Sequence, residues 1–174
     1  MIGARTARLQ IEPLGRSHAP GLVEALAHPA VGRFIGGPDV TTVDALHARL
    51  DRLARGSGRP DEIWLNFAVR RADDGVVLGR LEATTYGDWA EIAYLLGPAH
   101  QGRGYAREAV RWLIEALGAA AIDEVWAAVH PDNLRSIRLL EALGFTRRST
   151  TTRELGSYDP GDLAFSHSQR GARS

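Results

Sequence analysis

A glycine-rich stretch in the middle of the chain has the residue types best suited to bind a phosphate group. An apolar run ends at Gly97-Pro98, and the segment Gln101–Ala106 then leads directly into a helical pattern. Glycines let backbone N–H groups approach a ligand closely, and a helix begins with unpaired N–H groups and partial positive charge. Arg103 and Arg107 accompany the small residues, and no acidic residue occurs from 97 to 107. The pattern therefore predicts a phosphate pocket.

Three alternatives for this loop can be compared with the sequence. A nucleoside-triphosphate loop ends in Gly-Lys-Ser or Gly-Lys-Thr, and this chain has no lysine. A dinucleotide loop needs a small residue three places after Gly104, where this chain has Arg107, and it is expected in an early strand–loop–helix unit. The last alternative is a glycine-rich connector that binds nothing.

Two segments of the chain resemble the GCN5-related N-acetyltransferase (GNAT) superfamily. Gln101, Gly104 and Ala106 fit the anchors of its Gln-x-x-Gly-x-Gly/Ala pyrophosphate loop. The segment from Asn133 to Phe145 is similar to the N-x-x-S-x-x-L-L-E-x-x-G-F stretch of the ribosomal-protein-alanine N-acetyltransferase branch. The resemblance extends from residue 7 to about residue 167, which is nearly the whole chain.

The resemblance implies a binding site for acetyl-CoA, the acyl donor and co-substrate of this superfamily. In the fold that it implies, the strands Trp89–Leu96 and Glu124–Val129 splay apart, and the pantetheine arm enters between them. Loop N–H groups would hold the pyrophosphate, the two arginines would add charge, and a strand residue would offer its backbone to the arm. The implied donor-binding residues are Leu95, Leu96, Gln101, Gly102, Arg103, Gly104, Tyr105, Ala106, Arg107 and Asn133.

Glu91 and Ser136 are the catalytic residues that the resemblance implies. An amine must lose a proton to attack the thioester, so a base is required, and Glu91 precedes the proposed wedge on its strand. Many members of the superfamily protonate the departing thiolate with a tyrosine seven residues after the asparagine. This chain has Leu140 there, so Ser136 is expected to serve instead. The structural alternatives are an exposed Glu91 paired with an arginine, and a Ser136 that satisfies the first turn of its helix.

The composition excludes several kinds of chemistry. The 174 residues include no cysteine and no lysine, so neither a thiol nucleophile nor a Schiff-base lysine is available. The six histidines lack metal-site spacing, and we expect no metal. A formal net charge of zero implies no general attraction to nucleic acid or membrane. With neither a signal peptide nor a membrane-length apolar run, the sequence predicts a cytoplasmic protein.

The expected function is therefore an acetyl-CoA-dependent N-acetyltransferase that modifies a primary amine, either a protein or peptide N-terminus or a small molecule. The alternative is a non-catalytic module that senses acyl-CoA. The protein is expected to be a monomer or a homodimer.

Apolar periodicity predicts the elements that must position these residues. They form one α/β (α+β) domain over residues 1–167 with a mixed sheet in the GNAT order β-α-α-β-β-β-α-β-α-β-β, followed by a frayed tail over 168–174. The expected strands are Ala7–Glu12, Ile63–Arg71, Val76–Tyr86, Trp89–Leu96, Glu124–Val129, Thr146–Leu155 and Asp162–His167. The expected helices are Ser17–His28, one that starts at Thr41 or Thr42, Tyr105–Gly118, and one from Asp132 or Asn133 to Gly144.

Overall fold

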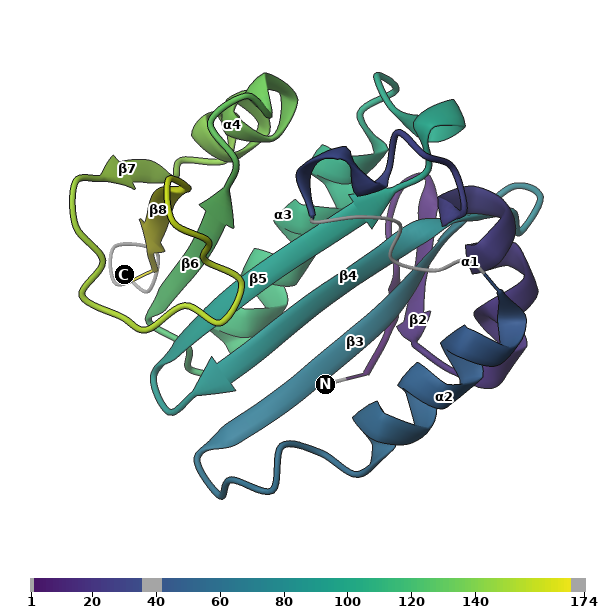
Figure 1. The fold of residues 1–174 in the computed structure, drawn as a ribbon, viewed down its shortest axis with the longest axis horizontal. Helices are drawn as coiled ribbons and strands as arrows, with labels where there is room; N and C mark the ends of the chain where they lie inside the picture. Colours follow the sequence, from purple (N-terminus) through teal and green to yellow (C-terminus); the bar gives the residue numbers. More distant parts are fainter. Residues whose placement is uncertain (1, 36–41, 170–174) are drawn as a thin grey trace.

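The central feature of the computed structural model, which describes residues 2–35 and 42–169, is an eight-stranded mixed sheet in the order β1-β2-β3-β4-β5-β6-β8-β7 (Figure 1). The strands are β1 (Ala4–Arg5), β2 (Leu9–Pro13), β3 (Glu62–Arg71), β4 (Val77–Tyr86), β5 (Trp89–Leu96), β6 (Glu124–Val129), β7 (Thr146–Arg148) and β8 (Leu163–Ser168). The helices are α1 (Ala19–Leu26), α2 (Val43–Ala54), α3 (Tyr105–Ala119) and α4 (Leu134–Ala142), with short 3-10 turns at Arg16–His18, Gly32–Phe34 and Pro98–His100. Apart from the two-residue β1, this confirms the predicted fold and element order.

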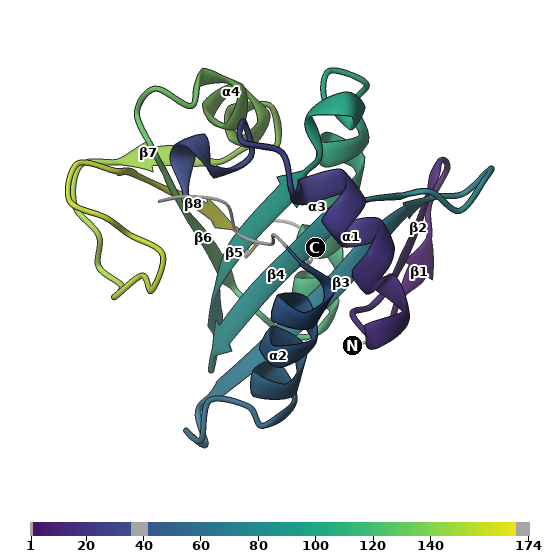
Figure 2. The same cartoon turned by 45° about the vertical axis from the view of Figure 1, so that its right-hand side comes forward.

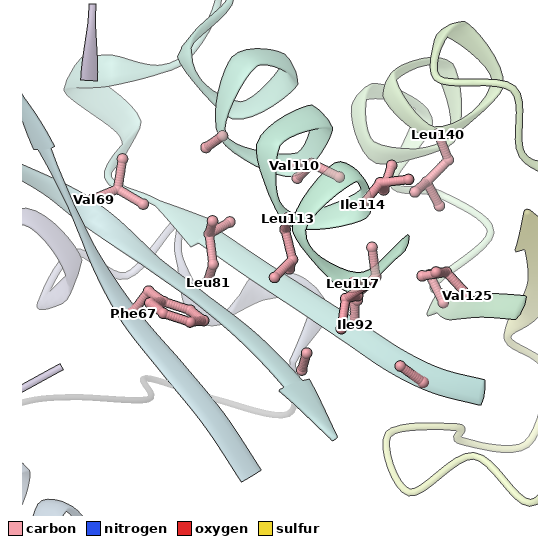
Figure 3. Packing of buried hydrophobic residues seen from close by; sticks show 14 of the residues in the cluster. Phe67, Val69, Leu81, Ile92, Val110, Leu113, Ile114, Leu117, Val125 and Leu140 are labelled. Carbon is pink, nitrogen blue, oxygen red and sulfur yellow. The ribbon is translucent and has the colours of Figure 1, made fainter. Parts of the chain in front are cut away.

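The helices cover both faces of the sheet, as Figure 1 and Figure 2 show from two directions. The buried stripe of α3, which includes Val110, Leu113 and Leu117, packs over Phe67, Leu81 and other residues of the strands (Figure 3). On the opposite face, α1 and α2 form a separate apolar cluster that includes Leu22, Leu46 and Leu50. The sheet is thus buried on both faces, and β5 runs through its middle.

Two predicted boundaries on the C-terminal side are wrong. The strand expected over Thr146–Leu155 ends at Arg148, because Leu155 leaves the sheet and packs against Trp89 and Trp126. Ordered structure continues beyond His167, since Ser168 belongs to β8 and the N–H of Gln169 donates to the carbonyl of Asp123 at 2.8 Å. Residues 170–174 of the expected tail, and residues 36–41 with Thr41, lie outside the described residues.

The N-terminal boundaries also differ in detail. The first helix begins at Ala19 rather than Ser17, because Arg16–His18 forms a 3-10 turn and Pro20 occupies the first turn of α1. Thr42 is the N-cap of α2, and its hydroxyl accepts a hydrogen bond from the N–H of Ala45 at 3.1 Å. This confirms Thr42 as the start of the second helix.

Candidate active site

The two parallel strands β5 and β6 pair only at their beginnings. The register joins Trp89 to Glu124, Ala90 to Val125 and Glu91 to Trp126, and no later pair is formed between these strands. In Figure 1 the two arrows form a V that opens toward α4. A cavity of about 730 Å³ lies at this divergence and is lined by residues 92–96 of β5 and 127–129 of β6. The predicted splayed strand pair is therefore present.

Main-chain groups of β5 face the cavity at alternate residues. The N–H of Gly97 donates to the carbonyl of Leu78 on β4 at 2.9 Å. Because successive residues of a strand direct their backbone groups to opposite sides, Leu95 also faces β4, and Leu96 faces the β6 side. The carbonyl of Leu96 accepts a hydrogen bond from Nε2 of Gln101 at 2.9 Å. Of the two predicted strand residues, Leu96 is the one whose backbone lies toward the cavity.

The glycine-rich loop has the backbone geometry that its sequence predicted. Gly102 has φ of +75° and Gly104 has φ of +80°, which a glycine adopts without steric cost. Gly104 is the N-cap of α3 and has no side chain to cap the N–H groups of the first turn. The N–H groups of Tyr105, Ala106 and Arg107 therefore start the helix without an intrahelical acceptor. This arrangement leaves main-chain donors available to an anion at the N-terminus of α3.

Several arginines surround this loop. Arg8 pairs with Glu108 at 2.7 Å and donates to the carbonyl of Arg103 at 2.9 Å. Nη1 of Arg135 donates to Oε1 of Gln101, and Nη2 of Arg107 donates to the carbonyl of Ala142 at 3.3 Å. Arg107 thus connects α3 to the end of α4.

The predicted donor-binding residues fall into two groups. Leu95, Leu96, Gln101, Ala106 and Asn133 line the cavity. The others are not part of its wall but form the loop and helix start beside it, and they are Gly102, Arg103, Gly104, Tyr105 and Arg107.

Glu91 is buried, with 7% of its surface exposed, and both carboxylate oxygens have partners. The N–H of Gly156 donates to Oε2 at 2.7 Å, and the N–H of Ser157 donates to Oε1 at 3.0 Å. The hydroxyl of Ser157 also donates to Oε1. The alternative of an exposed Glu91 paired with an arginine is therefore wrong. Gly156 and Ser157 line the cavity, whereas Glu91 does not.

Ser136 lies at the start of α4 and hydrogen-bonds to Tyr94 of β5. The two hydroxyl oxygens are 2.6 Å apart, and both residues line the cavity. Oδ1 of Asn133 accepts from the N–H of Ser136 at 3.2 Å, so Asn133 caps α4 as well as lining the cavity. Burial raises the pKa of Tyr94 to about 12, with the Ser136 hydrogen bond acting in the opposite direction, and the phenol keeps its proton at neutral pH.

Sequence reasoning missed Tyr94 and Ser157 as site residues. Tyr94 occupies the same strand face as the apolar Ile92 and Leu96, and its hydroxyl contacts that of Ser136. A signal was present in the strand pattern, because a polar-tipped side chain beside a predicted wedge requires a hydrogen-bond partner when buried. Ser157 carries no local signal, since its partner Glu91 lies 66 residues earlier in the sequence.

Neither metal ligands nor membrane helices are found in the described part of the chain. Within residues 2–35 and 42–169, no group of three or more His, Cys, Asp or Glu side chains could hold a metal ion. None of the helices in these ranges combines the length and the apolar character needed to cross a lipid bilayer.

Comparison with protein families identifies the chain. The Acetyltransferase (GNAT) domain matches residues 8–146, so the chain belongs to the GNAT acetyltransferase family. This confirms the family resemblance found in the sequence.

Two curated relatives are similar over part of their length. The "Probable N-acetyltransferase YjcK" of Bacillus subtilis (strain 168) is 36% identical over 117 residues, which is 64% of each chain. The "Uncharacterized N-acetyltransferase p20" of Bacillus licheniformis is 42% identical over 59 residues, which is 33% of each chain. The chain thus matches less than two thirds of the length of these relatives.

Solved structures share the fold over almost the whole chain. An acetyltransferase from Agrobacterium tumefaciens has a TM-score of 0.73 at 25% identity, covering 97% of this chain and 95% of the other. The ribosomal-protein-S5-alanine acetyltransferase from Vibrio fischeri has a TM-score of 0.76 at 18% identity, covering 97% of both chains. Mycobacterium smegmatis RimJ, solved in complex with CoA-disulfide, has a TM-score of 0.78 at 18% identity, covering 95% of this chain and 84% of the other.

Proposed function

We propose that this protein transfers an acetyl group from acetyl-CoA to a primary amine, by direct attack of the amine in a ternary complex. The observation that carries the proposal is the separation of β5 from β6 after Glu91. It leaves main-chain groups of β5, such as those of Leu96, facing a cavity of about 730 Å³ instead of a neighbouring strand. The amide groups of a pantetheine arm can pair with such a strand edge as an added strand does.

The phosphates of the donor fit the start of α3. N–H groups from Gly102 to Ala106 would bind the diphosphate, because the N-cap Gly104 has no side chain to satisfy the first turn of α3. Arg103 lies on the exposed loop itself and could add positive charge there. Arg107 would first have to release the carbonyl of Ala142.

The Tyr94–Ser136 pair is suited to protonate the departing thiolate. Ser136 lines the cavity at the N-terminus of α4, where the helix dipole favours negative charge on sulfur. Tyr94 keeps its proton at neutral pH and can donate to Ser136 as Ser136 donates to the sulfur. Ser136 thus has the proton-donor role, and Tyr94 orients its hydroxyl and replenishes its proton.

Glu91 is the base that we assign to the amine. It lies three residues before Tyr94 on β5, and its buried carboxylate has two backbone donors that hold it in one orientation. A positioned carboxylate of this kind contributes about 10²- to 10⁴-fold when it accepts a proton in the transition state.

The acceptor is a primary amine, and a peptide N-terminus is one candidate. Asp159 and Asp162 line the cavity and would attract an ammonium group. The similar V. fischeri structure is named for an alanine of a ribosomal protein. Peptides that begin with alanine therefore come first among the acceptors to be tested.

The test is acceptor-dependent release of free coenzyme A from acetyl-CoA. The panel contains peptides with Ala, Ser or Met at the N-terminus, together with small primary amines, and N-acetylated peptides serve as matched controls without a free amine. Release that requires the free amine supports the proposal. Tight binding of acetyl-CoA without acceptor-dependent release would contradict it and favour an acyl-CoA sensor.

A further inference from the structure

Glu91 and the cavity are separated by Ser157. Glu91 is buried and lies outside the cavity wall, whereas Ser157 is exposed and lines the cavity. The hydroxyl of Ser157 donates to Oε1 of Glu91. An amine in the cavity would therefore meet the Ser157 hydroxyl before it could meet the carboxylate.

Ser157 lies in the loop between β7 and β8, and contacts of residues 155–157 with β5 and β6 hold it in position. Leu155, two residues earlier, is 8% exposed and packs with Trp89 and Trp126. The N–H groups of Gly156 and Ser157 both donate to Glu91, at 2.7 Å and 3.0 Å. Three hydrogen bonds and one apolar anchor thus fix the hydroxyl relative to the carboxylate.

The geometry points to Ser157 as a catalytic residue that relays the proton of the acceptor amine to Glu91. The inference rests on the proposed N-acetyltransferase function and deepens it, because it names the group that touches the amine. A hydroxyl can accept a proton with one lone pair while donating its own, so Ser157 can exchange one hydrogen for another without a net charge.

An acceptor that binds as an ammonium ion first loses one proton to solvent, so the step begins with a neutral amine whose lone pair is free. From that point the protons and electrons balance. The lone pair of the amine nitrogen forms the bond to the thioester carbonyl carbon, and the carbon–sulfur bond breaks with its electron pair on sulfur. The nitrogen loses one proton to Oγ of Ser157, whose own proton passes to Oε1 of Glu91. The sulfur gains one proton from the Tyr94–Ser136 pair. Release of the Glu91 proton to solvent and uptake of one by the hydroxyl pair restore the protein.

A purely structural role for the same contacts makes a different prediction. If Glu91 only holds the loop in place, the two backbone N–H bonds provide most of that attachment, and they survive in Ser157→Ala. The relay instead requires the hydroxyl itself. Ser157→Ala therefore separates the relay from the attachment, which Glu91→Gln cannot do because it changes both.

The experiment measures kcat and KM for acetyl-CoA and for the best acceptor of the panel with Ser157→Ala and Ser157→Thr. Ser149→Ala is the matched control, because Ser149 is an exposed serine in the same loop. We expect Ser157→Ala to lower kcat by about ten- to a hundredfold, near the lower range for a positioned acid–base group, with KM for acetyl-CoA unchanged. Ser157→Thr restores the hydroxyl and most of kcat, and Ser149→Ala matches the wild type.

Each other outcome overturns the inference. If the wild-type protein is active and Ser157→Ala has the same kcat, the relay is excluded while the N-acetyltransferase function stands. If Ser157→Ala and Ser157→Thr raise the KM for the acceptor equally and change kcat little, Ser157 shapes the acceptor site and does not relay a proton. A wild-type protein that releases no coenzyme A with any amine contradicts both the relay and the proposed function.

Discussion

Gly102 of the loop before α3 provides a direct test of the proposed diphosphate site. Its φ is +75°, and a Cβ built there would meet nothing within 4 Å. In Gly102→Ala the steric cost is therefore confined to the left-handed backbone, about 1–2 kcal/mol for a residue with a side chain. Since residues 101–104 are exposed, the loop of the free variant can relax to a negative φ. Binding must then restore the original conformation.

This cost translates into a defined loss of affinity for coenzyme A. A penalty of about 1–2 kcal/mol corresponds to a dissociation constant about five- to thirtyfold higher. Isothermal titration calorimetry with coenzyme A measures this change, and thermal unfolding of the same samples reports on stability. Because the loop relaxes in the free variant, we expect little change in its melting temperature.

Gly58 supplies a matched control on another loop. Its φ is also +75°, nothing lies within 4 Å of a built Cβ, and it does not line the cavity. Gly58→Ala therefore has the same backbone cost without touching the proposed site, and it should bind coenzyme A as the wild type does. If Gly102→Ala binds with unchanged affinity, main-chain N–H groups of this loop do not hold the diphosphate. Equal weakening in both variants would also refute the reasoning.

Four further predictions follow from the site and from the hairpin between β3 and β4. Ser136→Ala removes the hydrogen-bond partner of the half-buried Tyr94 hydroxyl, so the free energy of unfolding in urea should fall by about 0.5–1.5 kcal/mol, and kcat should fall too. Intact turnover would mean that another group protonates the thiolate. Burial raises the pKa of Tyr94 to about 12, so the protonated phenol stabilises the folded protein fully below the usual tyrosine pKa of about 10, and this stabilisation is lost as pH rises toward 12. Melting curves of Tyr94→Phe should lack this loss of stability at alkaline pH. Glu91→Gln should lower kcat/KM strongly below about pH 8 and less above it, and an unchanged pH profile would exclude Glu91 as the base. The variant should also have a lower melting temperature, because the NH2 group of glutamine would face the N–H donors of Gly156 and Ser157. The hydrogen bonds from Arg71 lower the pKa of Asp74 to about 2, so the ionised carboxylate stabilises the fold above about pH 4, and this stabilisation is lost as pH falls toward 2. The melting temperature of Asp74→Asn should lack this part of the decrease at acid pH. A pH dependence like that of the wild type would refute the pairing.

Most of the fold could be predicted because its signals are local. The hairpin between β3 and β4 is specified by Asp73-Asp74-Gly75, and Gly75 has the positive φ of +71° that such a turn needs. The apolar residues that follow Glu91 in β5 indicate a strand buried on both faces, which the clusters on its two sides confirm. The start of α3 was also predictable, because a glycine loop before an amphipathic helix is a local pattern.

The segment between β7 and β8 was predicted incorrectly because its conformation depends on distant residues. The run Ser149–Thr152 is rich in β-branched threonine, which favours a strand by propensity. Its actual course is set by Leu155 packing on Trp89 and by hydrogen bonds to Glu91, more than 60 residues earlier in the sequence. The Tyr94–Ser136 contact spans 42 residues and was missed for the same reason. Local patterns therefore predicted the glycine loop and the splayed strands, but not the long-range contacts beside the cavity.

The spacing of Glu91 and Tyr94 on β5 explains how one strand can serve two opposite proton transfers. Side chains alternate between the faces of a strand, so residues three apart lie on opposite faces. Tyr94 packs with the cluster beneath α3 and α4, whereas Glu91 shares its face with Trp89 and meets the loop that carries Ser157. If both were on one face, the Tyr94 hydroxyl could hydrogen-bond to the Glu91 carboxylate, and it would then be drawn away from Ser136. In the proposed mechanism the intervening strand would keep the two hydroxyl groups apart, so the proton taken from nitrogen and the proton given to sulfur would follow separate routes.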